Sequence, residues 1–176
     1  SKTTTPDGVV YMVVLGPADT NELKRVRDLA TSTDNTWLAI ALGSIKDHND
    51  NSVVAIESLT ALKASAFVED KTAPVLVNFG VDLTNELLTI EFSETVLMES
   101  VDMTQIRLQG NAAGSGNVVT LSGQLSPFVD STIVAFKLKT DDLNKIKLHR
   151  DVCTIGSPSP SANCYLSMGS LAIKDM

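Results

Sequence analysis

Apolar and polar residues alternate along most of this chain, and a period of two restricts the chain to a mostly β fold. The alternation is clearest over 86–93, where one face carries only apolar side chains: Leu88, Ile90 and Phe92. Segment 132–139 has the same pattern on its apolar face: Val134, Phe136 and Leu138. Shorter strands are predicted at Val75–Phe79, Gln105–Leu108, Val118–Leu121 and Cys164–Met168. Many short strands separated by turn residues are typical of an antiparallel β-sandwich.

Only two stretches predict helices, and both are short. Asp19 and Glu22 have the spacing of a capping box that would start the first helix. A second helix is predicted to start at Asp141. Both continue with two apolar residues three positions apart: Leu23 with Val26, and Leu143 with Ile146. Each helix lies between two predicted strands, so we interpret each as a crossover between strands of a sandwich.

The most informative feature of the sequence is an internal repeat, because it predicts two units of one kind. Residues 37–47 match residues 165–175 without a gap, at an offset of about 128 residues. Upstream of that match, Val9–Leu15 and the helix from Asp19 correspond to Thr132–Leu138 and the helix from Asp141. The offset falls to about 120 at the helix, since the second copy has a longer loop. A repeat of this length suits one sandwich domain.

Neither copy of the repeat is complete. Residues 1–68 are predicted to be the C-terminal part of one repeat, which begins at its fifth strand. Residues 69–176 are predicted to hold most of the next repeat, without the last strand that the first copy has at Val53–Ile56. An open sandwich exposes unpaired N–H and C=O groups together with apolar core. We therefore expect either a longer tandem array or a neighbouring chain that supplies the missing strands.

The two cysteines, Cys153 and Cys164, bracket a loop that the first copy lacks. A pair gained together in one loop predicts a disulfide, and disulfides are typical of oxidising, extracytoplasmic compartments. The alternative is two unrelated buried thiols. The same loop holds three serines that alternate with prolines: Ser157, Ser159 and Ser161. They are candidate O-glycosylation sites if the protein is secreted, and otherwise belong to a stiff exposed turn.

Charge and motif content argue against several classes of function. The formal net charge of −7 at pH 7 argues against nucleic acid and against anionic membranes, because both select clustered lysine and arginine. The apolar runs have the length of strands, so no membrane insertion is expected. His48 and His149 have no partner at a recognisable catalytic spacing, and no zinc pattern occurs. We therefore expect no enzyme and no catalytic or cofactor-binding residue. Trp37 and Tyr165 align in the repeat and are predicted to be core aromatics.

An ordered set of short motifs resembles the tandem immunoglobulin-like or cadherin-like repeats of very large surface proteins from bacteria, algae, protists and invertebrates. The motifs are E-D-K-T-A-P-V-L at 69–76, L-T-I-E-F-S-E-T-V at 88–96, D-M-T-Q-I at 102–106, D-L-N-K-I-K at 142–147, and I-K-D at 45–47 and 173–175. The resemblance covers nearly the whole chain. It implies an all-β immunoglobulin-like sandwich with a short helix before the penultimate strand. It also implies an extracellular or cell-surface location and a non-enzymatic role.

Acidic residues suggest calcium as the one cofactor. In an antiparallel sandwich, the start of the first strand, the second loop and the last turn share one end. In the second copy these places hold Glu69, Asp70, Glu94 and Asp175. Carboxylate oxygens are preferred calcium ligands. In the first copy, the equivalent turn matches the D-x-N-D-N calcium string of cadherins, so its candidate ligands are Asp47, Asn49, Asp50 and Asn51. The alternative is a set of solvated turns, since Asn and Asp are good turn formers.

Together these features predict a structural repeat segment of an extracellular filament, sheath or adhesin. Its expected partners are neighbouring copies or repeats of the same protein, joined by strand complementation. Two other classes stay open. One is a calcium-dependent adhesion or glycan-binding module, and the other is an accessory domain of a secreted enzyme.

Overall fold

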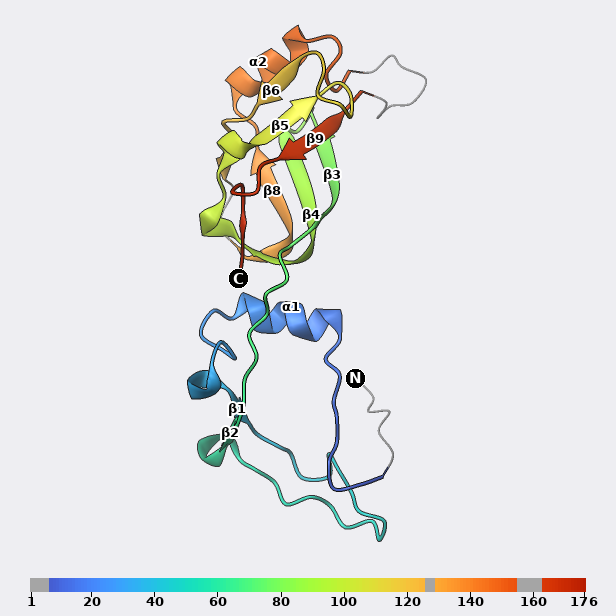
Figure 1. Cartoon of the computed structure of the whole chain (residues 1–176), viewed down its shortest axis with the longest axis vertical. Coiled ribbons are helices and arrows are strands. Elements are labelled where there is room, and N and C mark those ends of the chain that lie inside the picture. The colour runs from blue at the N-terminus through green and yellow to red at the C-terminus, as the bar shows by residue number, and fades with distance from the viewer. Residues whose placement is uncertain (1–6, 126–128, 155–162) are drawn as a thin grey trace. The chain divides into compact units, whose positions relative to one another are not determined.

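A computed structural model of the chain describes residues 7–125, 129–154 and 163–176. The chain divides into two units, Ser1–Thr72 and Ala73–Met176. The described residues form three antiparallel sheets and two short helices, so the prediction of a mostly β chain is confirmed (Figure 1). The three serines predicted as glycosylation sites, Ser157, Ser159 and Ser161, lie outside the described residues.

Residues 7–72, the described part of the first unit, contain one α-helix and a small sheet. Helix α1 (Pro17–Arg25) and the 3₁₀ turn η1 (Thr33–Asn35) precede strand β1 (Trp37–Leu38). A second 3₁₀ turn, η2 (Ser58–Thr60), precedes β2 (Leu62–Lys63), which pairs antiparallel with β1. Two isolated bridges extend this pairing: Ile40 with Ile56, and Lys46 with Ser52. None of residues 7–72 is buried, so the described part of this unit has no closed apolar core.

The prediction of a strand at Val9–Leu15 is wrong for the single chain, because none of these residues lies in a strand. Its repeat counterpart, Thr132–Leu138, lies in β8 (Ser131–Lys137) except for Leu138. Strand β8 pairs with β4 (Leu87–Leu97) on one side and β7 (Gln124–Leu125) on the other. Residues 7–72 hold no counterpart of β4 or β7 in the repeat alignment. A strand persists only where its N–H and C=O groups meet those of a neighbour. Val9–Leu15 therefore has the composition of a strand without its pairing partners.

In the described residues of the second unit, the strands form two antiparallel sheets. In the larger sheet the strand order is β10 (Lys174–Asp175), β4, β8 and β7, and β3 (Leu76–Asp82) also pairs with β4. In the smaller sheet the order is β6 (Val118–Thr120), β5 (Ile106–Gln109) and β9 (Tyr165–Met168). The 3₁₀ turns η3 (Met98–Ser100) and η4 (Met103–Gln105) lead from β4 to β5. Figure 1 shows β9 alongside β5 at the outer side of the smaller sheet.

Both sheets of the second unit contribute to one apolar core. The larger sheet supplies the residues that the alternation placed on one face: Leu88, Ile90, Phe92, Val134 and Phe136. The smaller sheet supplies Ile106, Leu108 and Val119. Each large side chain buried this way contributes about 1.5–3 kcal/mol of hydrophobic free energy. The prediction of inward and outward faces is confirmed, because Thr89, Glu91 and Ser93 alternate with the core residues and are not buried.

Helix α2 (Thr140–Leu148) buries Leu143 and Ile146, as their spacing predicts. Helix α1 starts earlier than predicted. Its first residue is Pro17 and its N-cap is Gly16, whose N–H donates to Oδ2 of Asp19 at 3.3 Å. Asp19 is therefore the third helical residue, and its predicted role as the N-cap is wrong. A proline suits the first turn, since it has no N–H to leave unpaired and its φ is already helical.

The predicted disulfide between Cys153 and Cys164 is confirmed. The bond joins Cys153, five residues after the end of α2, to Cys164, the residue before β9, with a Cα–Cα separation of 4.2 Å. Around it, the N–H of Cys153 donates to the carbonyl of Asn163 at 2.8 Å. Reducing the bond frees a loop of 11 residues in the unfolded chain.

Reduction of this disulfide is expected to lower the free energy of unfolding of the second unit by about 3 kcal/mol, because the open loop gains entropy in the unfolded state. Urea denaturation followed by far-ultraviolet circular dichroism, with and without dithiothreitol, measures the change. A Cys153→Ala, Cys164→Ala variant is the control, since its stability should not respond to dithiothreitol. An unchanged urea midpoint for the reduced parent chain would contradict the prediction.

Candidate functional site

The first candidate site is the open segment, which we define as residues Val9–Leu15. All seven residues are apolar, and their exposed fractions range from 41% for Tyr11 to 102% for Val9. The repeat counterpart of Val13 is Phe136, which is 1% exposed in the core of the second unit. Seven consecutive apolar residues, none of them buried, leave apolar surface on both faces of the segment. The open segment is therefore a surface with the composition of a core strand.

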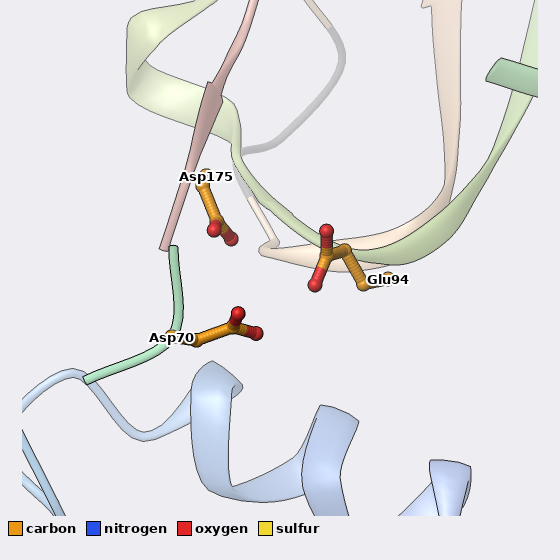
Figure 2. A group of neighbouring side chains, drawn as sticks. All are labelled: Asp70, Glu94 and Asp175. Carbon is orange, nitrogen blue, oxygen red and sulfur yellow. The ribbon is translucent and has the colours of Figure 1, made fainter. Parts of the chain in front are cut away.

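The second candidate site is a pair of carboxylates in the second unit. Oxygens of Glu94 and Asp175 lie within 4.8 Å of each other, and Figure 2 shows the two side chains turned toward the same space. Glu94 lies in β4 where the pairing with β8 shifts register between Glu91 and Val96, and such an irregularity redirects a side chain. Asp175 lies in β10, opposite Val96. The two candidate ligands that sequence reasoning assigned to this end of the second unit thus come together.

The third predicted ligand, Asp70, belongs to the first unit. Its Oδ2 lies 2.8 Å from Nζ of Lys24 on α1, and its Oδ1 accepts from the N–H of Thr72 at 2.9 Å. The Lys24 ammonium and the Thr72 hydrogen bonds lower the pKa of Asp70 to about 2. Because a lysine already neutralises this carboxylate, a metal ion that bound Asp70 would compete with the lysine for the same oxygens.

We expect the carboxyl group of Asp70 to titrate near pH 2, and Lys24→Met to raise its pKa toward the ordinary value of 3.8. The folded pKa is below the unfolded one, so the stability from this pair is present above pH 3.8 and is lost as the pH falls toward 2. Carbon-13 NMR titration of the carboxyl group measures the pKa. Lys46→Met, which breaks the ion pair with Asp50 in the same unit, is the control. An unchanged pKa of Asp70 in Lys24→Met would contradict the assignment.

The predicted calcium turn at 47–51 is a hydrogen-bonded turn. Oδ1 of Asp47 accepts from the N–H groups of Asn49 and Asn51, and Oδ2 accepts from the side-chain amide of Asn51, all at 2.9 Å. These bonds, the side-chain one first, lower the pKa of Asp47. Asp50 adopts a left-handed φ of 67° and pairs with Nζ of Lys46 at 2.7 Å. The contacts are those of an Asx turn, and calcium binding by this turn stays a prediction.

The two aligned aromatic residues are not buried, so their prediction as core aromatics is wrong. Trp37 is 54% exposed and Tyr165 is 36% exposed. The indole N–H of Trp37 donates to the carbonyl of Asp34 at 3.2 Å, and the ammonium of Lys63 lies 5.9 Å from the ring centroid. Tyr165 is exposed because it alternates in β9 with Leu166 and Met168, which pack against the core, so its side chain lies on the opposite face. Trp37 is exposed because none of residues 7–72 forms a closed core to cover it.

Asp142 is a structurally important residue that sequence reasoning did not single out for its side chain. It is fully buried, and its Oδ2 accepts from the N–H of Ser122 at 2.7 Å while Oδ1 accepts from the Ser122 hydroxyl at 3.0 Å. Lys145, one turn later on α2, lies 3.7 Å from Oδ1. The carboxylate thereby ties the first turn of α2 to the segment after β6. The sequence signal available for the burial of Asp142 was its place directly before Leu143, which is also buried.

Comparison with known proteins finds no matching family model, no matching curated protein and no matching solved structure. In the part of the chain that the structure describes, neither α1 nor α2 is long and apolar enough to cross a membrane.

Proposed function

We propose that this chain is a non-enzymatic structural segment of an extracellular filament, sheath or adhesin, built from immunoglobulin-like repeats that complete one another by exchanging strands. The observation that carries the proposal is the contrast between two equivalent segments. Val9–Leu15 is exposed along its whole length, whereas Val134 and Phe136, the counterparts of Tyr11 and Val13, lie in the core of the second unit. Burying the open segment against strands from a neighbouring copy would remove a large apolar surface from water.

The strand order of the second unit supports the immunoglobulin-like part of this proposal. An immunoglobulin-type sandwich has four strands in the order A-B-E-D in one sheet, and strands C, F and G in the other. Strands β3, β4, β8 and β7 follow the first order, and β5 and β9 occupy the places of C and F. The described residues contain no strand in the place of G, beside β9. The disulfide supports the extracellular part, because such bonds persist in oxidising compartments.

Self-association of the purified chain tests the proposal. Analytical ultracentrifugation and negative-stain electron microscopy at increasing concentration should show elongated polymers, with a blue shift of Trp37 fluorescence as the first unit becomes covered. Val13→Asp places a charge in the open segment and should keep the chain monomeric. Val68→Asp is the matched control, because Val68 is an exposed valine of the same unit outside the open segment. A parent chain that stays monomeric with unshifted fluorescence would contradict the proposal.

A second candidate function is calcium-dependent adhesion, favoured by the approach of Glu94 and Asp175. At a calcium concentration of about ten times the dissociation constant, linkage would add about 1.4 kcal/mol to the stability of the second unit. That corresponds to roughly 6 °C in melting temperature. We expect this rise on addition of calcium and its loss on addition of a chelator, measured by scanning calorimetry.

Two variants serve as a matched pair in this measurement. Glu94→Gln should abolish the calcium-dependent rise, whereas Glu91→Gln, earlier in the same strand, should keep it. An identical melting temperature with calcium and with chelator would remove this candidate.

A further inference from the structure

The outer edge of β9 presents backbone groups with no strand beside them in the described residues. The N–H of Gly169 donates to the carbonyl of Gln105 in the neighbouring chain segment before β5. Residues of an antiparallel strand direct their N–H and C=O groups alternately to one side and the other. With the register Arg107 opposite Ser167, residues 165, 167 and 169 therefore face β5. Leu166 and Met168 direct their N–H and C=O groups toward the open edge.

The first unit contains the pairing that this edge lacks. In the repeat alignment, Leu38 is the counterpart of Leu166 and Ile40 that of Met168. Ile40 exchanges both backbone hydrogen bonds with Ile56, at 3.0 and 2.8 Å. Leu38 pairs with Leu62. Leu38 and Ile40 therefore use their backbone N–H and C=O groups for pairing in the first unit. Their counterparts, Leu166 and Met168, direct the same groups to the open edge of β9.

No residue of the segment that makes these pairs, 52–63, is fully buried in the first unit. Leu62 is 61% exposed and Val54 is 82% exposed. Leu166 and Met168, in contrast, pack against the core of the second unit. The same segment placed beside β9 would extend a sheet that covers a closed apolar core, so its apolar side chains would gain more burial there.

We propose that the open edge of β9 binds the segment Ser52–Lys63 of a second copy of this chain, with Ile56 opposite Met168 and Leu62 opposite Leu166. The turn between these two pairs, η2, bulges out as it does in the first unit. This inference rests on the proposed strand exchange and names the acceptor edge and the donor segment. The affinity comes from backbone hydrogen bonds and the register from the apolar side chains, as in other cases of β-strand addition.

Residue-resolved amide exchange tests the proposal on the full chain. A synthetic peptide with the sequence of residues 52–63 is the probe. On binding, the amides of Leu166 and Met168 should exchange at least about tenfold more slowly, because they become hydrogen-bonded. The amide of Ser167, which already faces β5, should change little. Protection at strands of the larger sheet, without protection of Leu166 and Met168, would overturn the proposal.

Two methylated peptides supply the matched control. Methylation of the Ile56 nitrogen removes a donor that faces the acceptor strand, and binding should weaken by about tenfold or more. Methylation of the Ala55 nitrogen, which faces away, should leave binding nearly unchanged. Equal binding of the two peptides would overturn the proposed register.

A substitution in the acceptor provides an independent measurement. Met168→Pro removes one outward N–H, and proline is tolerated in an edge strand at such a position. The variant should keep the amide protection of β4, which reports that the second unit is folded, and should bind the peptide at least about tenfold more weakly. Unchanged affinity in the folded variant would overturn the proposal.

The outcomes separate this inference from the proposed function. If polymers form while the amides of Leu166 and Met168 stay unprotected within them, the assignment of β9 fails and the structural proposal stands. If the peptide protects both amides while the chain never polymerises, the acceptor edge stands and the structural proposal fails.

Discussion

Phe136→Ala is expected to lower the free energy of unfolding of the second unit by about 3–5 kcal/mol, because it leaves a cavity in a closed core. Phe136 is 1% exposed and lies in the central strand β8, opposite Leu88 of β4 and Leu125 of β7. The loss would remove a large part of the total stability of a domain of this size. Urea denaturation followed by circular dichroism measures it, and the melting temperature should fall by more than about 10 °C.

Val13→Ala is the matched control for this substitution. Val13 is the repeat counterpart of Phe136 and is exposed in the isolated chain, so its truncation should change the stability of the monomer by less than about 0.5 kcal/mol. Under conditions where the chain polymerises, Val13→Ala should instead weaken association. A destabilisation of the monomer by Val13→Ala equal to that by Phe136→Ala would contradict the assignment of Val9–Leu15 as an open segment.

Asp142→Ala is expected to destabilise the second unit by roughly 3–5 kcal/mol, because two hydrogen bonds to a charged acceptor are lost. The carboxylate of Asp142 is the acceptor for both the N–H and the hydroxyl of Ser122. In the variant, the partly buried N–H of Ser122 has lost its acceptor. Helix α2 then has no side-chain hydrogen bond from Asp142 to the segment after β6. Thermal unfolding and amide exchange of the α2 residues measure the effect.

Two controls distinguish this hydrogen-bonding role from a general effect of charge. Asp141→Ala removes the neighbouring exposed carboxylate and should change stability by less than about 0.5 kcal/mol. Asp142→Asn keeps a side-chain acceptor, so it should lose only about half as much stability as Asp142→Ala. If Asp141→Ala and Asp142→Ala had equal effects, the interpretation of Asp142 as a buried tie would be wrong.

The strands of the second unit that have three or more residues were predictable because their local pattern agrees with their environment, whereas the two-residue strands β7 and β10 were not predicted. In β4, the alternation of Leu88, Ile90 and Phe92 with polar residues matches a strand with one face on the core. The same agreement holds for Val134 and Phe136 in β8. The disulfide was predictable for a different reason, since Cys153 and Cys164 occur together in a single inserted loop.

The first unit was predicted less well, because its pattern implies partners that the described residues do not contain. Val9–Leu15 has strand composition but no strand pairing, and Trp37 is exposed although it is a large aromatic. Local pattern states which face of a segment is apolar. It does not state whether a neighbour is present to cover that face.

Some features of the candidate sites were likewise predictable from the sequence, and others were not. The sequence assigned Glu94 and Asp175 to one end of the second unit from strand direction alone, and the structure brings their oxygens within 4.8 Å. The ion pair of Asp70 with Lys24 was not predicted, since it joins residues far apart in the sequence. The role of Asp142 was also hidden, because its partner Ser122 is 20 residues away and outside any helix.

By itself, the sequence determined the β-rich composition of the fold, the facing of its core strands, the two short helices and the paired cysteines. These depend on spacing within a few residues, and such spacing can be read directly. Only the tertiary structure decided which strands find neighbours, which aromatic residues stay exposed and which carboxylates are paired. Those outcomes depend on contacts between distant segments, whose free energy is set by burial and by hydrogen-bond geometry in three dimensions.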